Sequence, residues 1–117
     1  MDRLYRATLN TWNGLKFAAR SEAAFRQEIA VLMIAVPLAF VVGQGAWVRL
    51  VLIGAVVLVM VVELLNTAVE KLADRVSREI DVQIGTVKDI GSAAVALSLL
   101  LAGAAWLVAL AERLGWL

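Results

Sequence analysis

The chain has 117 residues, enough for one domain, and 62% of them are hydrophobic, against about 45–50% in soluble globular domains. A water-soluble protein of this length cannot bury that much apolar surface, so the excess requires lipid. The net charge of +1 neither favours nor excludes nucleic acid as a partner. The absence of cysteine and histidine excludes disulfides, thiolate chemistry and the usual zinc ligands, leaving carboxylates for any acid–base or metal chemistry.

The first predicted element is an amphipathic helix over about residues 3–20. Apolar side chains recur there at helical spacing and basic side chains fall largely on the other side, which is typical of a helix lying on a membrane surface. The apolar set includes Leu4, Tyr5, Leu9, Trp12 and Leu15, and the basic set is Arg3, Arg6, Lys16 and Arg20. The N-terminus lacks the pattern of a signal peptide, so we expect the first span to be retained.

Three apolar runs follow, each close to the ~20 residues that a helix needs to cross about 30 Å of hydrocarbon. They predict transmembrane helices over about residues 28–45, 48–66 and 90–111. Helical periodicity continues past the second run, so we expect that helix to extend beyond the bilayer and to end before Gly85. The predicted fold class is therefore all-α: one integral membrane domain, residues 1–117, with three transmembrane helices and an N-terminal amphipathic surface helix.

Basic residues indicate the orientation of these spans. They are concentrated before the first span and between the second and third, whereas the short loop between spans one and two has only Arg49 and the C-terminus only Arg113. The positive-inside rule therefore predicts a cytoplasmic N-terminus. Arg49 is expected to reach the headgroups with its long side chain.

Four polar residues form a stripe along the second span. Glu63, Asn66, Glu70 and Asp74 lie within about 80° of one another on a helix that turns about 100° per residue. Glu63 is the deepest, because it follows an unbroken apolar run over residues 56–62. A carboxylate at that depth is costly, which favours a functional role. The alternative is that Glu63 marks the interface and pairs with a basic residue of the N-terminal helix.

Glu22 and Glu28 form a second acidic group. Six residues apart, they do not share a face of a straight helix, and they converge only if the amphipathic helix turns into the first span at this point. The alternative is a solvated junction with an ion pair between Glu22 and Arg26 at i, i+4.

A third group lies at the expected start of the third span. Lys88 and the helix N-terminus together predict a phosphate site, because the first N–H groups of a helix are unpaired and its dipole favours anions. The alternative is that Lys88 anchors the span on the cytoplasmic side and that Thr86 or Asp89 caps the helix.

All three groups belong to one side of the membrane. Carboxylates without histidine or cysteine suit Mg²⁺, and nearby lysines and arginines suit phosphate, so the combination predicts phosphoryl transfer from a magnesium nucleotide to a lipid. The sequence has neither the Gly-x-x-x-x-Gly-Lys-Ser/Thr loop nor the glycine-rich loop of the common soluble kinases.

Three stretches resemble a known family. Residues 22–28 (EAAFRQE), 63–70 (ELLNTAVE, followed by Asp74-Arg75) and 88–94 (KDIGSAA) occur in the order typical of the prokaryotic diacylglycerol kinase family, over roughly residues 3–115. The resemblance implies a homotrimer of the bacterial inner membrane with active sites shared between subunits at the cytoplasmic face. It implies transfer of the γ-phosphoryl group of ATP, with Mg²⁺, to the primary hydroxyl of diacylglycerol, giving phosphatidic acid.

The resemblance also implies roles for individual residues. Glu63 matches the family's general base, and Glu22 and Glu70 its metal and nucleotide carboxylates. About 10 Å of helix rise separates Glu63 from Glu70, which agrees with a deeper base beside the lipid hydroxyl and an outer carboxylate facing the nucleotide. Further nucleotide contacts are expected at Arg3, Asn10, Glu79, Asp81, Lys88 and Asp89, and substrate or supporting positions at Gln27, Glu28, Arg49, Asn66, Asp74 and Ser92.

Two alternatives stay open at this point. A sister branch of the same family phosphorylates undecaprenol and shares the acidic stripe, although residues 22–28 are more similar to the diacylglycerol branch. A non-catalytic membrane subunit or pore is the alternative from another class. A pore predicts polar residues through the full depth of the bilayer, whereas the second span is wholly apolar from Leu50 to Val62.

Overall fold

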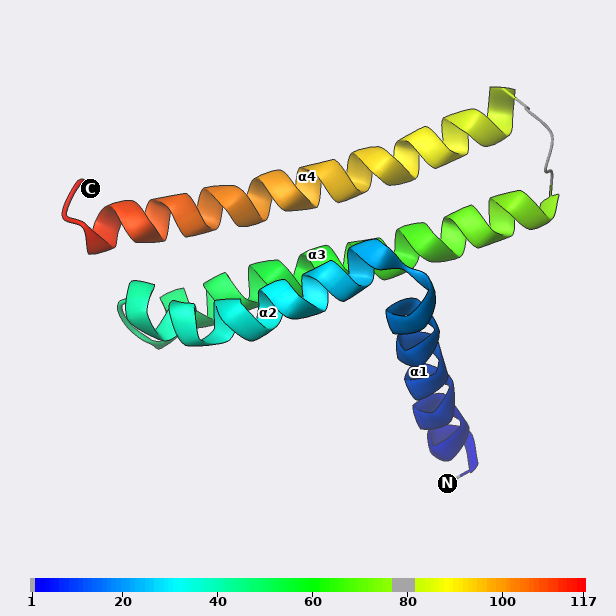
Figure 1. The fold of residues 1–117 in the computed structure, drawn as a ribbon, viewed down its shortest axis with the longest axis horizontal. Coiled ribbons are helices and arrows are strands. Elements are labelled where there is room, and N and C mark those ends of the chain that lie inside the picture. The colour runs from blue at the N-terminus through cyan, green and yellow to red at the C-terminus, as the bar shows by residue number, and fades with distance from the viewer. Residues whose placement is uncertain (1, 77–81) are drawn as a thin grey trace.

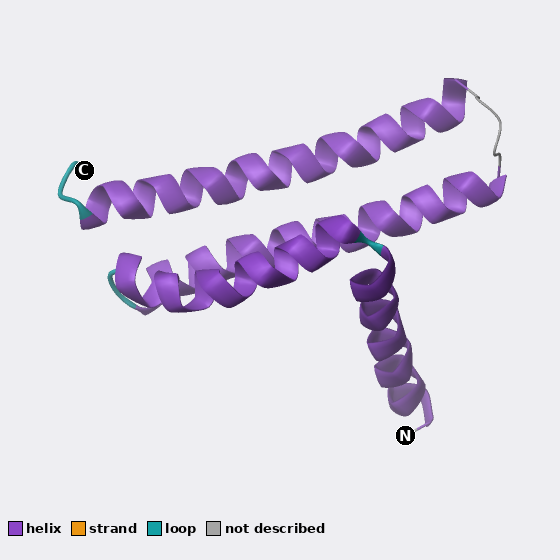
Figure 2. Cartoon of the chain, in the orientation of Figure 1, coloured by secondary structure: helices purple, strands orange, loops and turns teal. Residues whose placement is uncertain are grey.

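A computed structural model describes residues 2–76 and 82–117, and nearly all of them are helical (Figure 2). The helices are α1 (Asp2–Ser21), α2 (Ala23–Val42), α3 (Ala46–Val76) and α4 (Val82–Arg113). Helices α2, α3 and α4 run alongside one another, and α1 projects away from them (Figure 1). The expected helical continuation beyond the second apolar run is present, since α3 extends to Val76.

The chain turns sharply between α1 and α2 at Glu22, whose backbone is extended at φ −112° and ψ 111°. The guanidinium of Arg26 bridges this corner: its Nη1 donates to the carbonyl oxygens of Arg20 at 2.9 Å and Ala19 at 3.3 Å. These carbonyls belong to the last turn of α1, which has no following turn to donate to them. Arg26 therefore stabilises both the end of α1 and the direction in which α2 leaves it.

At the opposite end, a short turn joins α2 to α3. Gly45 has a φ of +100°, a conformation that side-chain-bearing residues rarely adopt. Arg49 donates from Nε to the Gly43 carbonyl at 3.2 Å, and Arg113 at the end of α4 donates from Nε to the Val41 carbonyl at 3.1 Å. Two cations thus lie at the C-terminal end of α2, where the helix dipole favours positive charge.

A small buried apolar cluster lies in the half of the bundle near the α2–α3 turn. Ala39, Leu52 and Ala109 are buried together, one from each of α2, α3 and α4. Trp106 packs beside them and donates its indole N–H to the Leu52 carbonyl at 3.1 Å. The alanines allow the helices to approach closely, as is common between helices in membranes.

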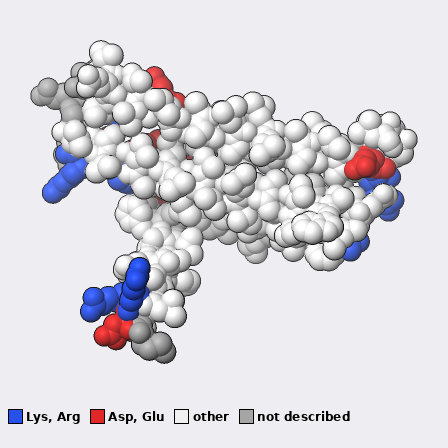
Figure 3. Space-filling model, turned by 180° about the vertical axis from the view of Figure 1, so that it is seen from behind, with Lys and Arg blue, Asp and Glu red and all other residues white. Residues whose placement is uncertain are grey.

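Helices α2, α3 and α4 are each long enough and apolar enough to cross a membrane. Many of their large apolar side chains are exposed, including Met33 at 73% and Leu100 at 69%. Charged side chains gather near the ends of the bundle and on the far end of α1, and the middle of the face in Figure 3 is free of charge. This distribution confirms the predicted fold class, three apolar helices of membrane-spanning type preceded by an N-terminal helix.

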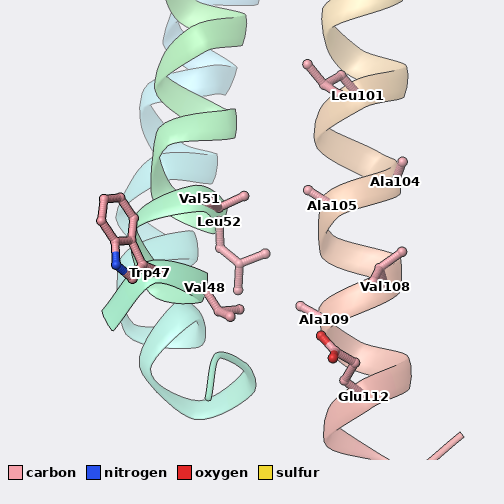
Figure 4. A pocket seen from close by; sticks show the side chains of 10 residues that line it. All are labelled: Trp47, Val48, Val51, Leu52, Leu101, Ala104, Ala105, Val108, Ala109 and Glu112. Atoms are coloured by element: carbon pink, nitrogen blue, oxygen red, sulfur yellow. The ribbon is translucent and has the colours of Figure 1, made fainter. Parts of the chain in front are cut away.

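An open apolar groove of about 420 Å³ runs between the first half of α3 and the second half of α4 (Figure 4). Trp47, Val51, Leu101 and Val108 contribute to its lining, and Glu112 is the one charged residue at its edge. A single carboxylate lies at this groove, whereas the acidic stripe of α3 lies at the other end of the bundle.

Candidate functional site

Carboxylates from three parts of the chain come together where the α1–α2 corner meets α3. Glu63 is half-buried and lies near enough to Glu22, Glu28 and Glu70 for their charges to interact with its own. The condition for Glu22 and Glu28 to converge, a turn of the chain at this point, is met by the break at Glu22. One continuous helix could not have brought these four side chains together.

The α3 stripe is tied together by its own side chains and by α4. Asn66 donates from Nδ2 to Oε1 of Glu70 at 3.2 Å, one helical turn further along. Lys88 of α4 forms an ion pair with Asp74, with 2.6 Å between Nζ and Oδ1. The charge of Lys88 also acts on Glu70. A cation from α4 therefore lies beside Glu70 and Asp74, the two carboxylates of the stripe nearest the C-terminal end of α3.

Two oxygen atoms in this region are buried without a hydrogen-bond partner among the described residues: Oε1 of Glu28 and Oδ1 of Asn66. Burying such an atom unpaired costs about 1–3 kcal/mol, so an unpaired buried oxygen calls for a partner outside the chain or a structural reason. Asn66 has a structural reason, since its oxygen fills the space beside Gly91 of α4.

Glu22 and Arg26 do not form the ion pair considered from the sequence. The Arg26 guanidinium donates to the main chain at the end of α1 instead, and this leaves the Glu22 carboxylate to the acidic cluster. The bond that Arg26 makes is tertiary in origin, because it depends on the turn between two helices and not on i, i+4 spacing within one helix.

The prediction of a helix N-terminus at Lys88 is wrong. Helix α4 begins at Val82, so the main-chain N–H groups near Lys88 lie inside the helix and are not available to a phosphate. Thr86 and Asp89 are also within α4, and the Thr86 hydroxyl donates to the Val82 carbonyl, so neither residue caps the helix. Any attraction of Lys88 for phosphate comes from its side chain alone.

Other candidates lie outside the cluster. Arg49 is at the far end of α3, about 21 Å of helix rise from Glu63, where it binds the end of α2. Its expected support of the substrate stays a prediction. Arg3 and Asn10 are exposed on α1 away from its C-terminal end. Gln27, Asp89 and Ser92 are exposed, at positions close in sequence to Glu28, Lys88 and Gly91. Glu79 and Asp81 lie outside the described residues.

The donor set is suited to a hard cation but incomplete. Among residues 2–76 and 82–117, no three acidic side chains approach closely enough to hold a metal ion by themselves. Mg²⁺ commonly takes one or two protein carboxylates and completes its shell with water and substrate phosphates. Glu22 and Glu70 each offer carboxylate oxygens and each interact with Glu63, so they are donors of the type that this pattern requires.

Two residues that matter here were not among the predicted site residues. Arg26 builds the corner, although the sequence suggested it only as an ion-pair partner of Glu22, and Gly91 accommodates Asn66, although it was considered only as part of a motif. Gly91 did give a signal, because glycine inside a helix is unfavourable by about 1 kcal/mol unless packing requires it.

Comparison with known proteins identifies the family of this chain. The family described as "Prokaryotic diacylglycerol kinase" matches residues 9–110. A protein of Escherichia coli strain K12 named "Diacylglycerol kinase" is 40% identical over 113 residues, covering 97% of this chain and 93% of the relative. Proteins of the same name from Haemophilus influenzae and Pseudomonas aeruginosa are 39% and 36% identical, each over 91% of this chain and over 90% and 86% of their own lengths.

Proposed function

The chain belongs to the prokaryotic diacylglycerol kinase family, and from that premise we propose that it transfers the γ-phosphoryl group of ATP to the primary hydroxyl of diacylglycerol. The products are phosphatidic acid and ADP. The observation that supports this most directly is the acidic cluster: a half-buried carboxylate, Glu63, follows an unbroken apolar stretch and is adjoined by Glu22, Glu28 and Glu70.

Glu63 acts as the general base. Its position at the end of the apolar part of α3 is where the hydroxyl of a membrane lipid would enter, with the acyl chains along the bundle. The hydroxyl oxygen attacks the γ-phosphorus while Glu63 accepts the hydroxyl proton, and the bond from that phosphorus to the bridging oxygen of ADP breaks.

Glu70 and Glu22 bind the magnesium nucleotide. Glu70 is one helical turn beyond Asn66, and Asn66 fixes one of its oxygens by donating from Nδ2. These carboxylates are the residues that would hold Mg²⁺, which when bound neutralises charge on the transferring phosphoryl group. Lys88, beside Glu70 and paired with Asp74, supplies positive charge for the phosphates of ATP.

We further propose that the protein works as a homotrimer in the bacterial inner membrane, with the cluster at the cytoplasmic face. The exposed apolar surface of the three long helices and the groove between α3 and α4 leave room for neighbouring subunits as well as lipid. Composite sites would supply ligands for Mg²⁺ that the described residues of one chain do not bring together. The basic residues before the first span and after the second support a cytoplasmic location of the cluster.

Purified protein in detergent, supplied with radiolabelled ATP, Mg²⁺ and an equal mixture of diacylglycerol and undecaprenol, tests this function. We expect the label in phosphatidic acid. Label in undecaprenyl phosphate would replace the lipid assignment while retaining the kinase, and label in neither lipid would reject the proposal.

A further inference from the structure

Gly91 is in unusually close contact with the acidic stripe. The oxygen Oδ1 of Asn66 occupies the place that a β-carbon at position 91 would take, so any side chain there would collide with it. Six of the other seven glycines have open space at the same position. Gly91 belongs to α4 and Asn66 to α3, so the absence of one side chain sets how closely the asparagine approaches the neighbouring helix.

The contact fixes the rotation of the Asn66 amide. Oδ1 is buried and accepts no hydrogen bond among the described residues, so no donor on that side orients the group. Two things remain to orient it: packing of Oδ1 against Gly91, and donation from Nδ2 to Oε1 of Glu70 at 3.2 Å. With a methyl group at position 91, the amide must turn or withdraw, because it is the movable end of a side chain while the α4 backbone is held by its helix.

We propose that Gly91 is a positioning residue that acts through Asn66 on Glu70. The bare α-carbon lets the amide lie flat against α4 with its N–H toward Glu70, and this donation holds the carboxylate in the orientation that receives the magnesium nucleotide. The inference rests on the proposed function of Glu70 as a nucleotide-side carboxylate, and it adds a second residue of α4, after Lys88, to that site.

The test compares Gly91→Ala, Asn66→Ala, the double variant and Gly85→Ala. Gly85 is on the same helix with open space at its β-position, which makes it the matched control. We expect Gly91→Ala to raise the KM for magnesium–ATP about tenfold, the usual effect of losing a hydrogen bond to a charged acceptor, with little change in the KM for lipid. In the Asn66→Ala background the same substitution should have no further effect, because the group through which it acts is gone.

Binding of magnesium with a non-hydrolysable ATP analogue, measured without lipid, separates this inference from the proposed function. The Kd should rise in Gly91→Ala and stay at the wild-type value in Gly85→Ala whether or not diacylglycerol is the acceptor. A wild-type Kd and KM in Gly91→Ala would overturn the inference. So would an equal loss in both the wild-type and the Asn66→Ala backgrounds, which would mean that Gly91 serves only helix packing. The double variant, in which no collision remains, provides a folded comparison if Gly91→Ala alone is unstable.

Discussion

Glu63 combines two properties that a general base at a membrane surface needs. It is partly withdrawn from water behind an apolar helical stretch, and three other carboxylates lie close enough to oppose its negative charge. A group of that kind is better suited to take a proton from a lipid hydroxyl than an ordinary exposed carboxylate is.

Glu63→Gln should therefore lower kcat by about 10²–10⁴-fold, since the amide retains the shape of the side chain but cannot accept the proton. Binding of magnesium–ATP and the oligomeric state should be nearly unchanged. Steady-state kinetics, nucleotide binding and size-exclusion chromatography on the same preparation measure all three. Glu112→Gln, the same change at the opposite end of the bundle, is the control; wild-type turnover in Glu63→Gln would reject its role as base.

Glu70→Gln should act on a different constant. Replacing one oxygen of the carboxylate by an amide removes negative charge from the proposed metal side, so the KM for magnesium–ATP should rise about tenfold while the KM for lipid changes little. Titrating ATP and lipid separately distinguishes the two effects. An unchanged KM for magnesium–ATP would contradict the nucleotide role of Glu70.

At this scale, the sequence predicts contacts within a helix better than contacts between helices. The spacing of Asn66 and Glu70 places them one turn apart, and the structure has the corresponding hydrogen bond. The pairing of Lys88 with Asp74 and the packing of Asn66 on Gly91 depend on how α4 is set against α3, which no local spacing specifies.

Among the elements, the corner between α1 and α2 determines whether a site forms at all. The Arg26 guanidinium of α2 joins the two helices by donating hydrogen bonds to carbonyls in the last turn of α1. A contact from α3 adds to this, since the Lys71 ammonium lies 5.6 Å from the centre of the Phe17 ring of α1.

Arg26→Met should weaken this corner. The methionine keeps much of the aliphatic length but donates no hydrogen bond to the end of α1, so we expect a loss of about 1 kcal/mol in stability, limited by the exposure of the bonds, together with reduced kcat. Thermal unfolding in detergent and initial rates measure the two effects. Arg20→Met, a matched change at the end of α1, should leave both near wild type, and equal behaviour of the two variants would contradict the corner-holding role of Arg26.

The bounds of the elements show why hydropathy and helix length must be kept apart. Apolar runs marked the parts of α3 and α4 suited to lipid, but α4 begins at Val82, well before the apolar run from Ile90. Residues 82–89 are too polar for the hydrocarbon and still form helix, because main-chain hydrogen bonding does not require apolar side chains. The wrong expectation for a phosphate site beside Lys88 followed from equating the two.

For the whole molecule, three long apolar helices require the ends of α2 and α3 that meet at the Gly43–Gly45 turn to lie across the membrane from the acidic cluster. The chain has no cysteine, so single cysteines can report the side on which a residue lies. In right-side-out vesicles, a membrane-impermeant maleimide should label Gln44→Cys and leave Ser21→Cys unlabelled until the vesicles are opened. The reverse pattern would invert the proposed orientation.

The absence of charge along the middle of the face shown in Figure 3 has a bioenergetic consequence. No ionisable side chain lies between Leu50 and Val62 of α3 or between Ile90 and Ala111 of α4, so a proton taken up at Glu63 has no relay to the far side. It must return to the compartment from which ATP came. Phosphorylation then moves no proton across the membrane. Turnover should therefore not depend on the transmembrane voltage, and a high level of this enzyme in the membrane should not dissipate the proton gradient.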